Sequence, residues 1–195
     1  MLPKVNLLPV SRDDVKRIAS WLEDDEVNSI WYGRNQEGIP QHVGYSPKEM
    51  ADAGEELWEQ VFNDPRRKVF SIYDEGQHIG EGQIFLETLL SNGRVFVLVG
   101  PKELWYRGYG TAAMVEMLDL VFYTYNLHRA WVDFPEYNAP ALHMCENIGF
   151  VLEGHLRGRH PKDGAWYDTL TMGLLADEYA RRLARLLGEV EDSQA

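Results

Sequence analysis

One stretch, residues 94–114, constrains the fold of this chain more than any other part. Its apolar run Val95–Val99 is typical of a buried strand, and Gly100-Pro101 ends that strand. The glycine-bearing loop Arg107–Thr111 follows, and a helical pattern begins directly after it. Glycines let a backbone approach a ligand closely, and the first N–H groups of a helix have no partner within it. The stretch therefore predicts a site for a phosphate-bearing ligand.

Three phosphate ligands are considered for this loop. Gly108, Gly110 and Ala113 match the dinucleotide fingerprint G-x-G-x-x-A, which should follow its strand at once. Here Lys102 and Trp105 intervene between strand and glycine, so the match is weak. A Walker loop is excluded because the chain has no G-K-S/T. The pyrophosphate of coenzyme A is the third candidate, and a plain turn without a ligand is the alternative to all three.

Length and composition predict a single globular domain over residues 1–195. Apolar residues make up 45% of the 195 and charged residues 26%, which is ordinary for a soluble protein with a sizeable core. The formal charge of −12 argues against nucleic acid as a partner, because such binding needs a basic surface. The charge is compatible with a cationic substrate, although solubility explains it at least as well.

Cysteine and histidine usage gives expectations about compartment and metals. Cys145 is the one cysteine, so an intrachain disulfide is impossible and a reducing compartment fits. No run is long enough to cross a membrane, and the first residues lack the features of a signal peptide. The histidines do not pair at i, i+4 and no C-x-x-C exists, so we expect no metal. We expect a cytoplasmic protein.

Hydrophobic periodicity predicts alternating strands and helices. The expected strands are Val5–Val10, Lys68–Asp74, Ile79–Leu90, Val95–Val99, Arg129–Phe134, Phe150–Arg159 and Trp166–Met172, with hairpin turns at Ser91–Gly93 and Pro161–Gly164. The expected helices are Arg12–Glu23, Ser46–Phe62, Gly110–Tyr125, Ala141–Ile148 and Leu174–Leu187, with a frayed tail after the last. Asn28–Tyr45 is expected to be a loop whose Trp31, Tyr32 and Tyr45 either wall a substrate site or pack on the core edge. The order predicts an α/β fold with strands first antiparallel and then parallel, and helices on both faces.

Two motifs and a tail resemble one known family. Trp105–Ala112 resembles the acyl-CoA loop Q/R-x-x-G-x-G/A of the GNAT superfamily of N-acyltransferases. Asn138–Phe150, with Ala141, Cys145 and Gly149 inside it, resembles the next motif, N-x-x-A-x-x-x-Y-x-x-x-G-F. Glu153-Gly154 and Gly164–Asp168 are similar to the branch of ribosomal-protein N-terminal (RimJ/RimL-like) and spermidine acetyltransferases. The resemblance covers nearly the whole chain and is strongest over residues 94–172.

The resemblance implies a single-domain acyl-CoA N-acyltransferase fold. Its mixed sheet of six or seven strands would be splayed after the fourth strand, with acetyl-CoA as co-substrate in the splay and no metal. The pantetheine arm would bond to the backbone of Val97, Leu98 and Val99 and to Asn138. The pyrophosphate would lie on the backbone N–H groups of Tyr106, Arg107, Gly108, Tyr109, Gly110 and Thr111.

The implied activity is transfer of an acetyl group from acetyl-CoA to a primary amine by direct attack. Cys145 stands where many relatives carry the tyrosine thought to protonate the leaving thiolate, and Trp105 stands where the pattern has Gln or Arg. We therefore treat Cys145 as a catalytic candidate, with inert packing at least as favoured and a covalent intermediate ranked low. Glu87, Asp133 and Glu136 are candidates for the base, and for each of them a solvated acid at a strand end is the more favoured interpretation.

Several alternatives stay open at this point. A non-catalytic acyl-CoA-binding or sensing domain of the same fold would also explain the loop, and a nucleotide-dependent oxidoreductase would explain it less well. The acceptor is a polyamine, an aminoglycoside, a peptide N-terminus or another small amine. No membrane or nucleic-acid partner is expected, and the oligomeric state is open, with a homodimer among the options.

Overall fold

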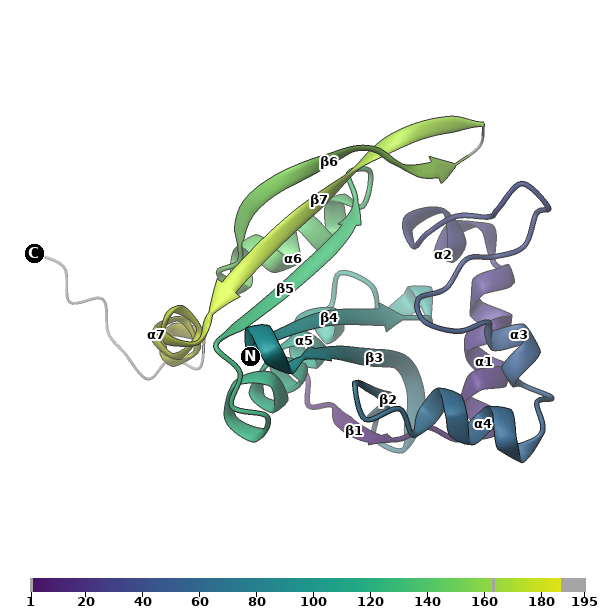
Figure 1. Ribbon diagram of the computed structural model, residues 1–195, viewed down its shortest axis with the longest axis horizontal. Helices are drawn as coiled ribbons and strands as arrows, with labels where there is room; N and C mark the ends of the chain where they lie inside the picture. Colours follow the sequence, from purple (N-terminus) through teal and green to yellow (C-terminus); the bar gives the residue numbers. More distant parts are fainter. Residues whose placement is uncertain (1, 163, 187–195) are drawn as a thin grey trace, which may run out of the picture.

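The computed structural model describes residues 2–162 and 164–186, and these form one mixed sheet flanked by helices (Figure 1). The seven strands of the described residues lie in the order β1-β2-β3-β4-β5-β7-β6. They are β1 Asn6–Pro9, β2 Arg67–Asp74, β3 Gln77–Glu87, β4 Asn92–Val99, β5 Arg129–Pro135, β6 Val151–Lys162 and β7 Ala165–Leu175. The helices are α1 Arg12–Glu23, α2 Asp25–Ile30, α3 Pro47–Met50, α4 Glu55–Phe62, α5 Tyr109–Asp119, α6 Ala139–Ile148 and α7 Ala176–Leu186.

The sheet confirms the predicted mixed topology and corrects one part of it. Neighbouring strands from β1 to β4 are antiparallel, and β4 pairs with β5 in parallel through the crossover helix α5. After the crossover the strands were expected to be parallel apart from the final hairpin. That hairpin, β6–β7, is antiparallel as expected, but β5–β7 is antiparallel too. The reason is that β6 and β7 form a hairpin, and β7 enters the sheet between β5 and β6.

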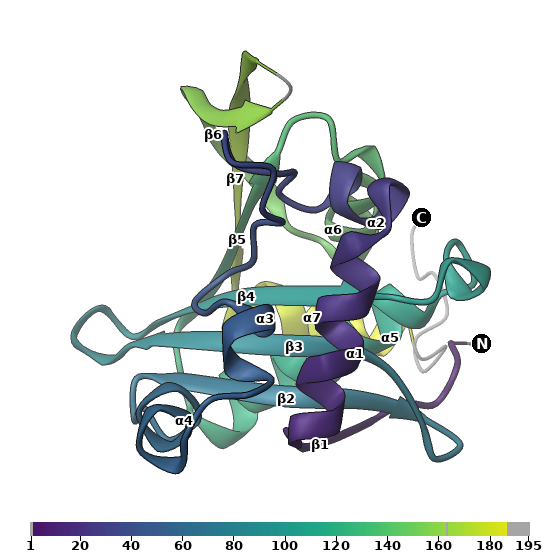
Figure 2. The same ribbon diagram turned by 90° about the vertical axis from the view of Figure 1, so that its right-hand side faces the viewer.

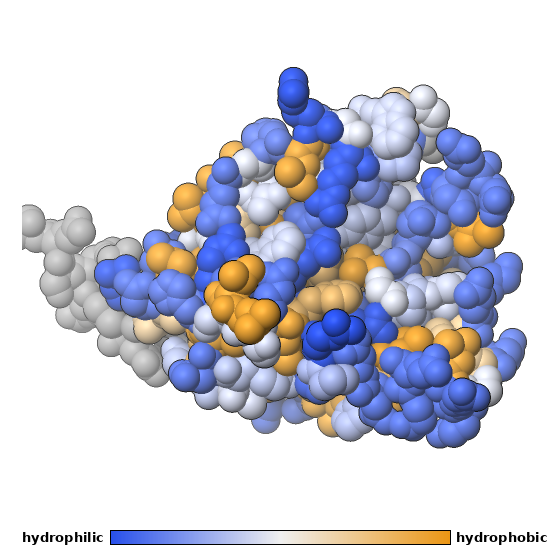
Figure 3. Space-filling view, viewed as in Figure 1, coloured by the Kyte–Doolittle hydropathy of each residue, from blue (hydrophilic) through white to orange (hydrophobic). Residues whose placement is uncertain are grey.

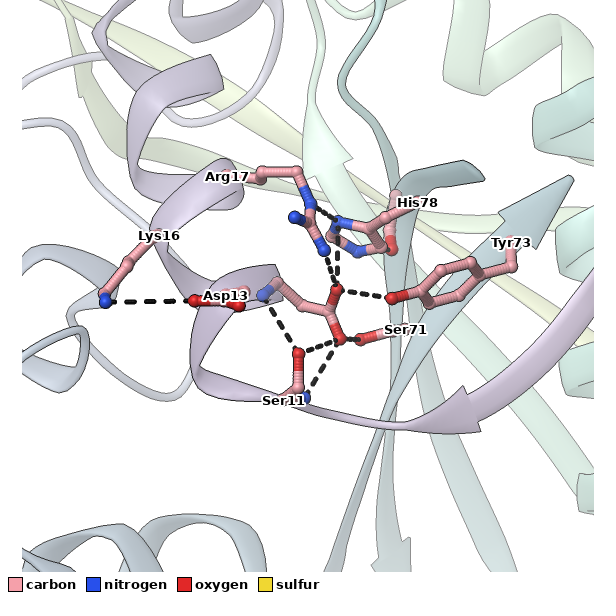
Figure 4. A network of polar contacts seen from close by, with 9 residues as sticks. Ser11, Asp13, Lys16, Arg17, Ser71, Tyr73 and His78 are labelled. Carbon is pink, nitrogen blue, oxygen red and sulfur yellow. Dashed lines mark hydrogen bonds and ion pairs between the residues drawn. The ribbon is translucent and has the colours of Figure 1, made fainter. Parts of the chain in front are cut away.

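Helix α1 begins as its sequence predicts. Ser11 is the N-cap, and its side chain and that of Asp14 bond each other's backbone N–H groups, so the capping box is formed. The same Asp14 carboxylate is buried and also accepts hydrogen bonds from Ser71, Tyr73 and Arg17. Figure 4 shows these side chains converging beside His78, which ties α1 to the sheet. Burial alone would raise the pKa of this carboxyl, but the hydrogen bonds, led by that of Tyr73, hold it well below its usual range.

Two helical predictions near the N-terminus were partly wrong. Residues 28–30, expected to begin a loop, are the end of α2, which Asp24 caps by accepting from the N–H groups of Glu26 and Val27. The single helix expected over residues 46–62 is divided into α3 and α4. Gly54 is the N-cap of α4, and a glycine weakens a helix interior enough to separate the two.

The strand expected to run to Leu90 ends at Glu87, and a 3₁₀ turn, Thr88–Leu90, with Ser91 in the left-handed region (φ 53°) leads into β4. The helix expected over residues 110–125 is α5 followed by a π-helical stretch, Leu120–Thr124, closed by the bond from Tyr125 N to Leu120 O at 2.8 Å. In the last hairpin, Pro161 and Lys162 still belong to β6 instead of the turn. The expected end of the last helix at Leu187 and the tail beyond it lie outside the described residues.

The two faces of the sheet carry different helices. Figure 2 shows α1, α3 and α4 in front of the strands and α5 behind them. The main core lies on the α5 face and includes residues from β3, β4, β5, β7, α5 and α6, such as Ile84, Val95, Met117, Val132 and Ile148. A second cluster on the α1 face joins Ile18, Leu22, Val27, Trp31, Phe96 and Leu98. The pairing of β4 with β5 ends at Arg94 and Trp131, so the sheet opens between the C-terminal ends of these two strands.

Candidate active site

The sheet opens between β4 and β5, as the resemblance implied. The two strands pair only from Asn92 to Arg94 with Arg129 to Trp131, and Figure 1 shows β5 rising away from β4 beyond that point. The backbone groups of Val97 and Val99 on this side therefore lack a strand partner in β5. Where two neighbouring strands separate, each has an edge of unpaired backbone groups in the middle of the sheet. An extended ligand can hydrogen-bond to such an edge as a further strand would.

A cavity of about 410 Å³ fills the splay. All of the predicted cofactor-contact residues line it except Arg107 and Tyr109. They are Val97, Leu98, Val99, Tyr106, Gly108, Gly110, Thr111 and Asn138. The opposite wall comes from α6 and from α2, so the structure brings together two motifs that lie far apart in the sequence. Lys102 holds α2 over this cavity by ion pairs with Asp24 (2.8 Å) and Glu26 (3.0 Å).

The glycine loop has the geometry of an anion site. Gly108 is the N-cap of α5 with φ 87°, a left-handed conformation that other residues adopt only with strain, and no side chain caps the helix. The first N–H groups of α5 therefore have no partner inside the helix, and they lie at the cavity. Gly110 is helical, so its dihedrals do not require glycine. An added Cβ there would lie 3.4 Å from Met144 Sδ, inside the cavity.

The two exceptions point away from the cavity lining. Tyr109 Oη donates to Asp74 at 2.8 Å, which directs this side chain to β2, and Arg107 is exposed. Trp105, the departure from the family pattern, donates from Nε1 to the carbonyl of Val99 at 2.9 Å. Trp105 thereby fixes the loop to the end of β4 with an indole in place of the expected Gln or Arg side chain.

A smaller cavity of about 50 Å³ lies deeper in the splay. It shares Trp31, Val97, Asn138, Ala141 and Met144 with the larger cavity, so the two are adjacent along β4. Its other lining residues include Tyr32, Asp133 and Cys145. Asn138 Oδ1 accepts from Ala141 N at 3.1 Å, so this side chain caps α6 and also lines both cavities.

Cys145 is buried at the inner end of the splay. Burial raises the pKa of its thiol from an ordinary value of 9.0 to about 12, so the thiol is protonated at neutral pH. A protonated thiol is a poor nucleophile, and only the thiolate attacks. The geometry therefore favours packing, or donation of a proton, over a covalent intermediate.

The three acids considered as the base have different surroundings. Asp133 lines the small cavity, but its carboxylate is paired with Arg94 and Arg159. Glu87 is opposite Asn92 at the far end of β4 from Val97, so the structure does not bring it to the cavities. Glu136 is exposed and accepts from Asp168 N at 2.9 Å, which joins β5 to β7. Asp168 also accepts from Gly158 N, which joins β7 to β6 in the last hairpin.

Sequence reasoning missed the residues that hold Trp31. Trp31 Nε1 donates to His42 Nδ1 at 3.2 Å, and His42 Nε2 lies 2.9 Å from Glu81 Oε1. Both His42 and Glu81 have side chains 1% exposed, and Glu81 also accepts from Gln83. Tyr45 was expected either to wall a substrate site or to pack on the core edge. Its hydroxyl donates a hydrogen bond to the same Glu81 carboxylate that His42 contacts. These contacts join positions far apart in the chain, so no local pattern marks them.

Tyr32 lines the small cavity, so it fits the expectation of a wall residue and not that of packing on the core edge. Its Oη donates to the carbonyl of Asp133 at 3.2 Å, and burial together with the Asp133 charge raises the pKa of this phenol. His160 of β6 lies 2.7 Å from the carbonyl of Tyr32. The loop after α2 and the β6–β7 hairpin therefore meet at the inner end of the splay.

A larger, open cavity of about 690 Å³ lies between α1, the β2–β3 turn and the residues after β4. Its lining includes Arg17, Trp21, His78 and Gly100, and none of the predicted site residues. Among the described residues no group of three His, Cys, Asp or Glu side chains is placed to hold a metal ion. No helix in the described part of the chain is long and apolar enough to span a membrane.

Comparisons with known proteins agree with this geometry. The model of the acetyltransferase (GNAT) domain family matches residues 4–151. Spermidine N(1)-acetyltransferase of Vibrio cholerae is 26% identical over 162 residues, covering 83% of this chain and 94% of the relative. Spermidine N(1)-acetyltransferase of Escherichia coli K12 is 20% identical over 175 residues, covering 90% of this chain and 88% of the relative.

Solved structures share the fold. RimJ of Mycobacterium smegmatis in complex with CoA-disulfide has a TM-score of 0.75 at 23% identity and covers 94% of this chain and 90% of its own. The V. cholerae spermidine N-acetyltransferase in complex with CoA and spermine has a TM-score of 0.74 at 22% identity, with 90% and 98% covered.

Proposed function

This chain belongs to the GNAT acetyltransferase family, and we propose that the cavity between β4 and α6 is the place where it binds acetyl-CoA. The protein is an acetyl-CoA-dependent N-acetyltransferase that moves an acetyl group to an amine. The family match leaves the oxidoreductase alternative without support, and it favours catalysis over a sensing role. Our proposal extends to the roles of the individual residues of the splay.

The observation that carries the proposal is the pair of adjacent cavities along β4. In our proposal the pantetheine arm completes the sheet beside Val97–Val99, and the pyrophosphate lies over the N-terminus of α5 at Gly108 and Gly110. The acetyl group then lies at the small cavity, whose volume of about 50 Å³ suits a group of a few atoms. Asn138, which lines both cavities, contacts the pantetheine arm between them.

The amine reaches the thioester from the side of Tyr32 and Asp133. The neutral amine attacks the thioester carbonyl, and the tetrahedral intermediate places its negative charge near the unpaired N–H groups of β4. The C–S bond breaks as the carbonyl re-forms, the nitrogen releases its extra proton to water, and the coenzyme A thiolate takes a proton from water. Because Asp133 is ion-paired and Glu87 and Glu136 lie away from the cavities, we propose that the ammonium loses its proton to water. Cys145 is positioned to donate a weak hydrogen bond to the leaving sulfur.

An amine panel tests this proposal. Purified protein is incubated with acetyl-CoA and with polyamines, aminoglycosides, peptides and small amines, and the products are identified by mass spectrometry. We expect acetylated amine and free coenzyme A in equal amounts. Thermal unfolding provides a binding control, because a ligand of the folded state raises the melting temperature. A stabilising effect of NAD without any effect of coenzyme A would contradict the proposal.

A further inference from the structure

Three charged side chains meet at the inner end of the splay. Asp133 is buried and lines the small cavity. Arg94 approaches its Oδ1 with Nε at 2.6 Å and Nη2 at 2.5 Å, whereas Arg159 approaches Oδ2 with Nη1 alone at 3.2 Å. Two guanidinium groups and one carboxylate leave this cluster with a charge of about +1. A positive cluster beside an amine-acetylating centre is unexpected in a chain whose formal charge is −12.

The two arginines are held differently. Arg94 is 23% exposed at its side chain and lies over the rings of Phe96 (4.5 Å) and Trp131 (5.0 Å), so its two bonds to Asp133 are part of a packed wall. The Arg159 side chain is 48% exposed and makes one bond. A guanidinium has five N–H donors in a planar fork. Arg159 therefore retains donors that its bond to Asp133 does not use.

A β-bulge brings Arg159 to this position. Three residues of β6, 157–159, lie between the pairs Leu156–Thr169 and His160–Tyr167, where β7 has only Asp168. Gly158 has φ 56°, and its N–H donates to Asp168 Oδ1 at 2.9 Å. Bulges change the direction of a side chain and are common beside active sites. In Figure 3 strongly hydrophilic residues lie in the upper part of this face, over β6 and β7, among paler and hydrophobic ones.

We propose that Arg159 binds a carboxylate of the acceptor, so that the preferred acceptor is a primary amine that also carries a carboxylate. The inference rests on the proposed function, because it places the amine between Tyr32 and Asp133. Arginine recognises carboxylates through paired hydrogen bonds, and the net positive charge repels a polycation such as a polyamine. The same charge also favours the neutral form of the attacking amine over its ammonium form.

Matched acceptors test the proposal with little ambiguity. An ω-amino acid series, from β-alanine to 6-aminohexanoate, is compared with alkylamines of the same chain length and with spermidine. Each matched pair differs by the carboxylate alone. We expect the kcat/KM of at least one ω-amino acid to exceed that of its alkylamine by about tenfold, which corresponds to about 1.4 kcal/mol. The preference should weaken as ionic strength rises, because Arg159 is half-exposed.

Two variants separate recognition from a structural role. Arg159→Gln should lose most of the preference, so that the ratio of the kcat/KM values of the ω-amino acid and its alkylamine falls toward one, whatever change in rate the two acceptors share. Arg157→Gln, an exposed arginine on the same strand, should leave both rates unchanged. Equal losses with both acceptors in Arg159→Gln, or a wild-type preference for spermidine, would overturn the carboxylate subsite. Absence of turnover with every amine would instead contradict the proposed function itself.

Discussion

Nε1 of Trp31 lies 3.2 Å from Nδ1 of His42, so the wall shared by the two cavities of the splay is held from behind by a buried histidine. His42 accepts from the indole on one side and meets Glu81 Oε1 at 2.9 Å on the other. The buried imidazole of His42 and the buried carboxylate of Glu81 thus hold the Trp31 side chain in place. In our proposal this relationship links stability to the binding of acetyl-CoA.

Replacing His42 should therefore affect both properties. His42→Phe removes the acceptor of Trp31 Nε1 and the partner of Glu81, and buried groups left unpaired cost about 1–3 kcal/mol each. We expect the free energy of unfolding to fall by about 2–3 kcal/mol and the KM for acetyl-CoA to rise several-fold, measured by urea unfolding and steady-state kinetics. Gln41→Ala, at the exposed neighbouring position, is the control and should change neither. Unchanged stability and KM in the His42 variant would show that Trp31 is held by packing alone.

Cys145 should be dispensable for the reaction. Cys145→Ser and Cys145→Ala are expected to keep turnover within about tenfold of the wild-type rate, because water can protonate the leaving thiolate. Loss of an essential catalytic group costs far more, about a thousandfold. A drop of that size in both variants, with coenzyme A affinity retained, would assign a chemical role to the thiol. The measurement is the initial rate of coenzyme A release with a saturating amine.

The same cysteine predicts a pH dependence. The pKa of its thiol rises from 9.0 to about 12 in the folded protein, so above pH 9 the unfolded chain binds fewer protons than the native one. The stabilising contribution is complete below pH 9 and is lost as pH rises from 9 to 12. Urea unfolding of the wild type and Cys145→Ala across pH 8–11 should show a steeper decline in the wild type. Parallel declines would indicate that the thiol titrates normally.

Asp14 is the corresponding case at acid pH. Its pKa is lowered in the folded protein, so its stabilising contribution is present above its ordinary value of 3.8 and is lost as pH falls below it. Asp14→Asn should lower the free energy of unfolding at pH 7 by about 2–3 kcal/mol, because the carboxylate serves several buried donors. Asp13→Asn is the matched control, since that side chain is 77% exposed and its ion pair with Lys16 lies at the surface. The difference between the Asp14 variant and the wild type is expected to narrow progressively as pH falls below 4, and a constant difference would contradict the assignment.

Local signals made much of the fold predictable. The capping box of Ser11 and Asp14 and the left-handed Gly149 after α6 each depend on a few neighbouring residues, and both are formed. The resemblance located the splay and most of the cavity lining, including Asn138. Where a local signal competed with another, the prediction failed. The acidic run from Asp24 to Glu26 caps and starts α2 but reads equally as a polar loop.

The polar contacts of the site were not predictable in the same way. His42 and Glu81 are 39 positions apart, as are Arg94 and Asp133. The loop after α2 brings His42 to Glu81 of β3, and the pairing of β4 with β5 brings Arg94 to Asp133. Glu87 and Asp133 read alike as acids near strand ends. The strand register places Glu87 opposite Asn92, the first residue of β4, whereas Asp133 lines the small cavity. Such information exists only in the folded chain.

The two glycines of the loop should respond differently to substitution. Gly108 has φ 87°, so Gly108→Ala is expected to cost about 1–2 kcal/mol of folding free energy in addition to any effect on binding. Gly110 is helical, so Gly110→Ala should leave stability nearly unchanged or slightly raise it. Thermal unfolding of the two ligand-free variants provides the comparison. Equal destabilisation by both would contradict the description of Gly110 as a residue that borders the ligand.

Isothermal titration of coenzyme A against Gly110→Val tests the central claim most directly, with circular dichroism to confirm folding. Valine at this position projects into the cavity beside Met144, and we expect the affinity to fall at least about tenfold, or about 1.4 kcal/mol. Arg107→Ala is the control, because Arg107 is exposed and its cation is not part of the cavity lining, so its loss should be smaller and should diminish at high salt. Full coenzyme A affinity in a folded Gly110→Val protein would mean that the pyrophosphate lies elsewhere, and would contradict the assignment of the splay as the acetyl-CoA site.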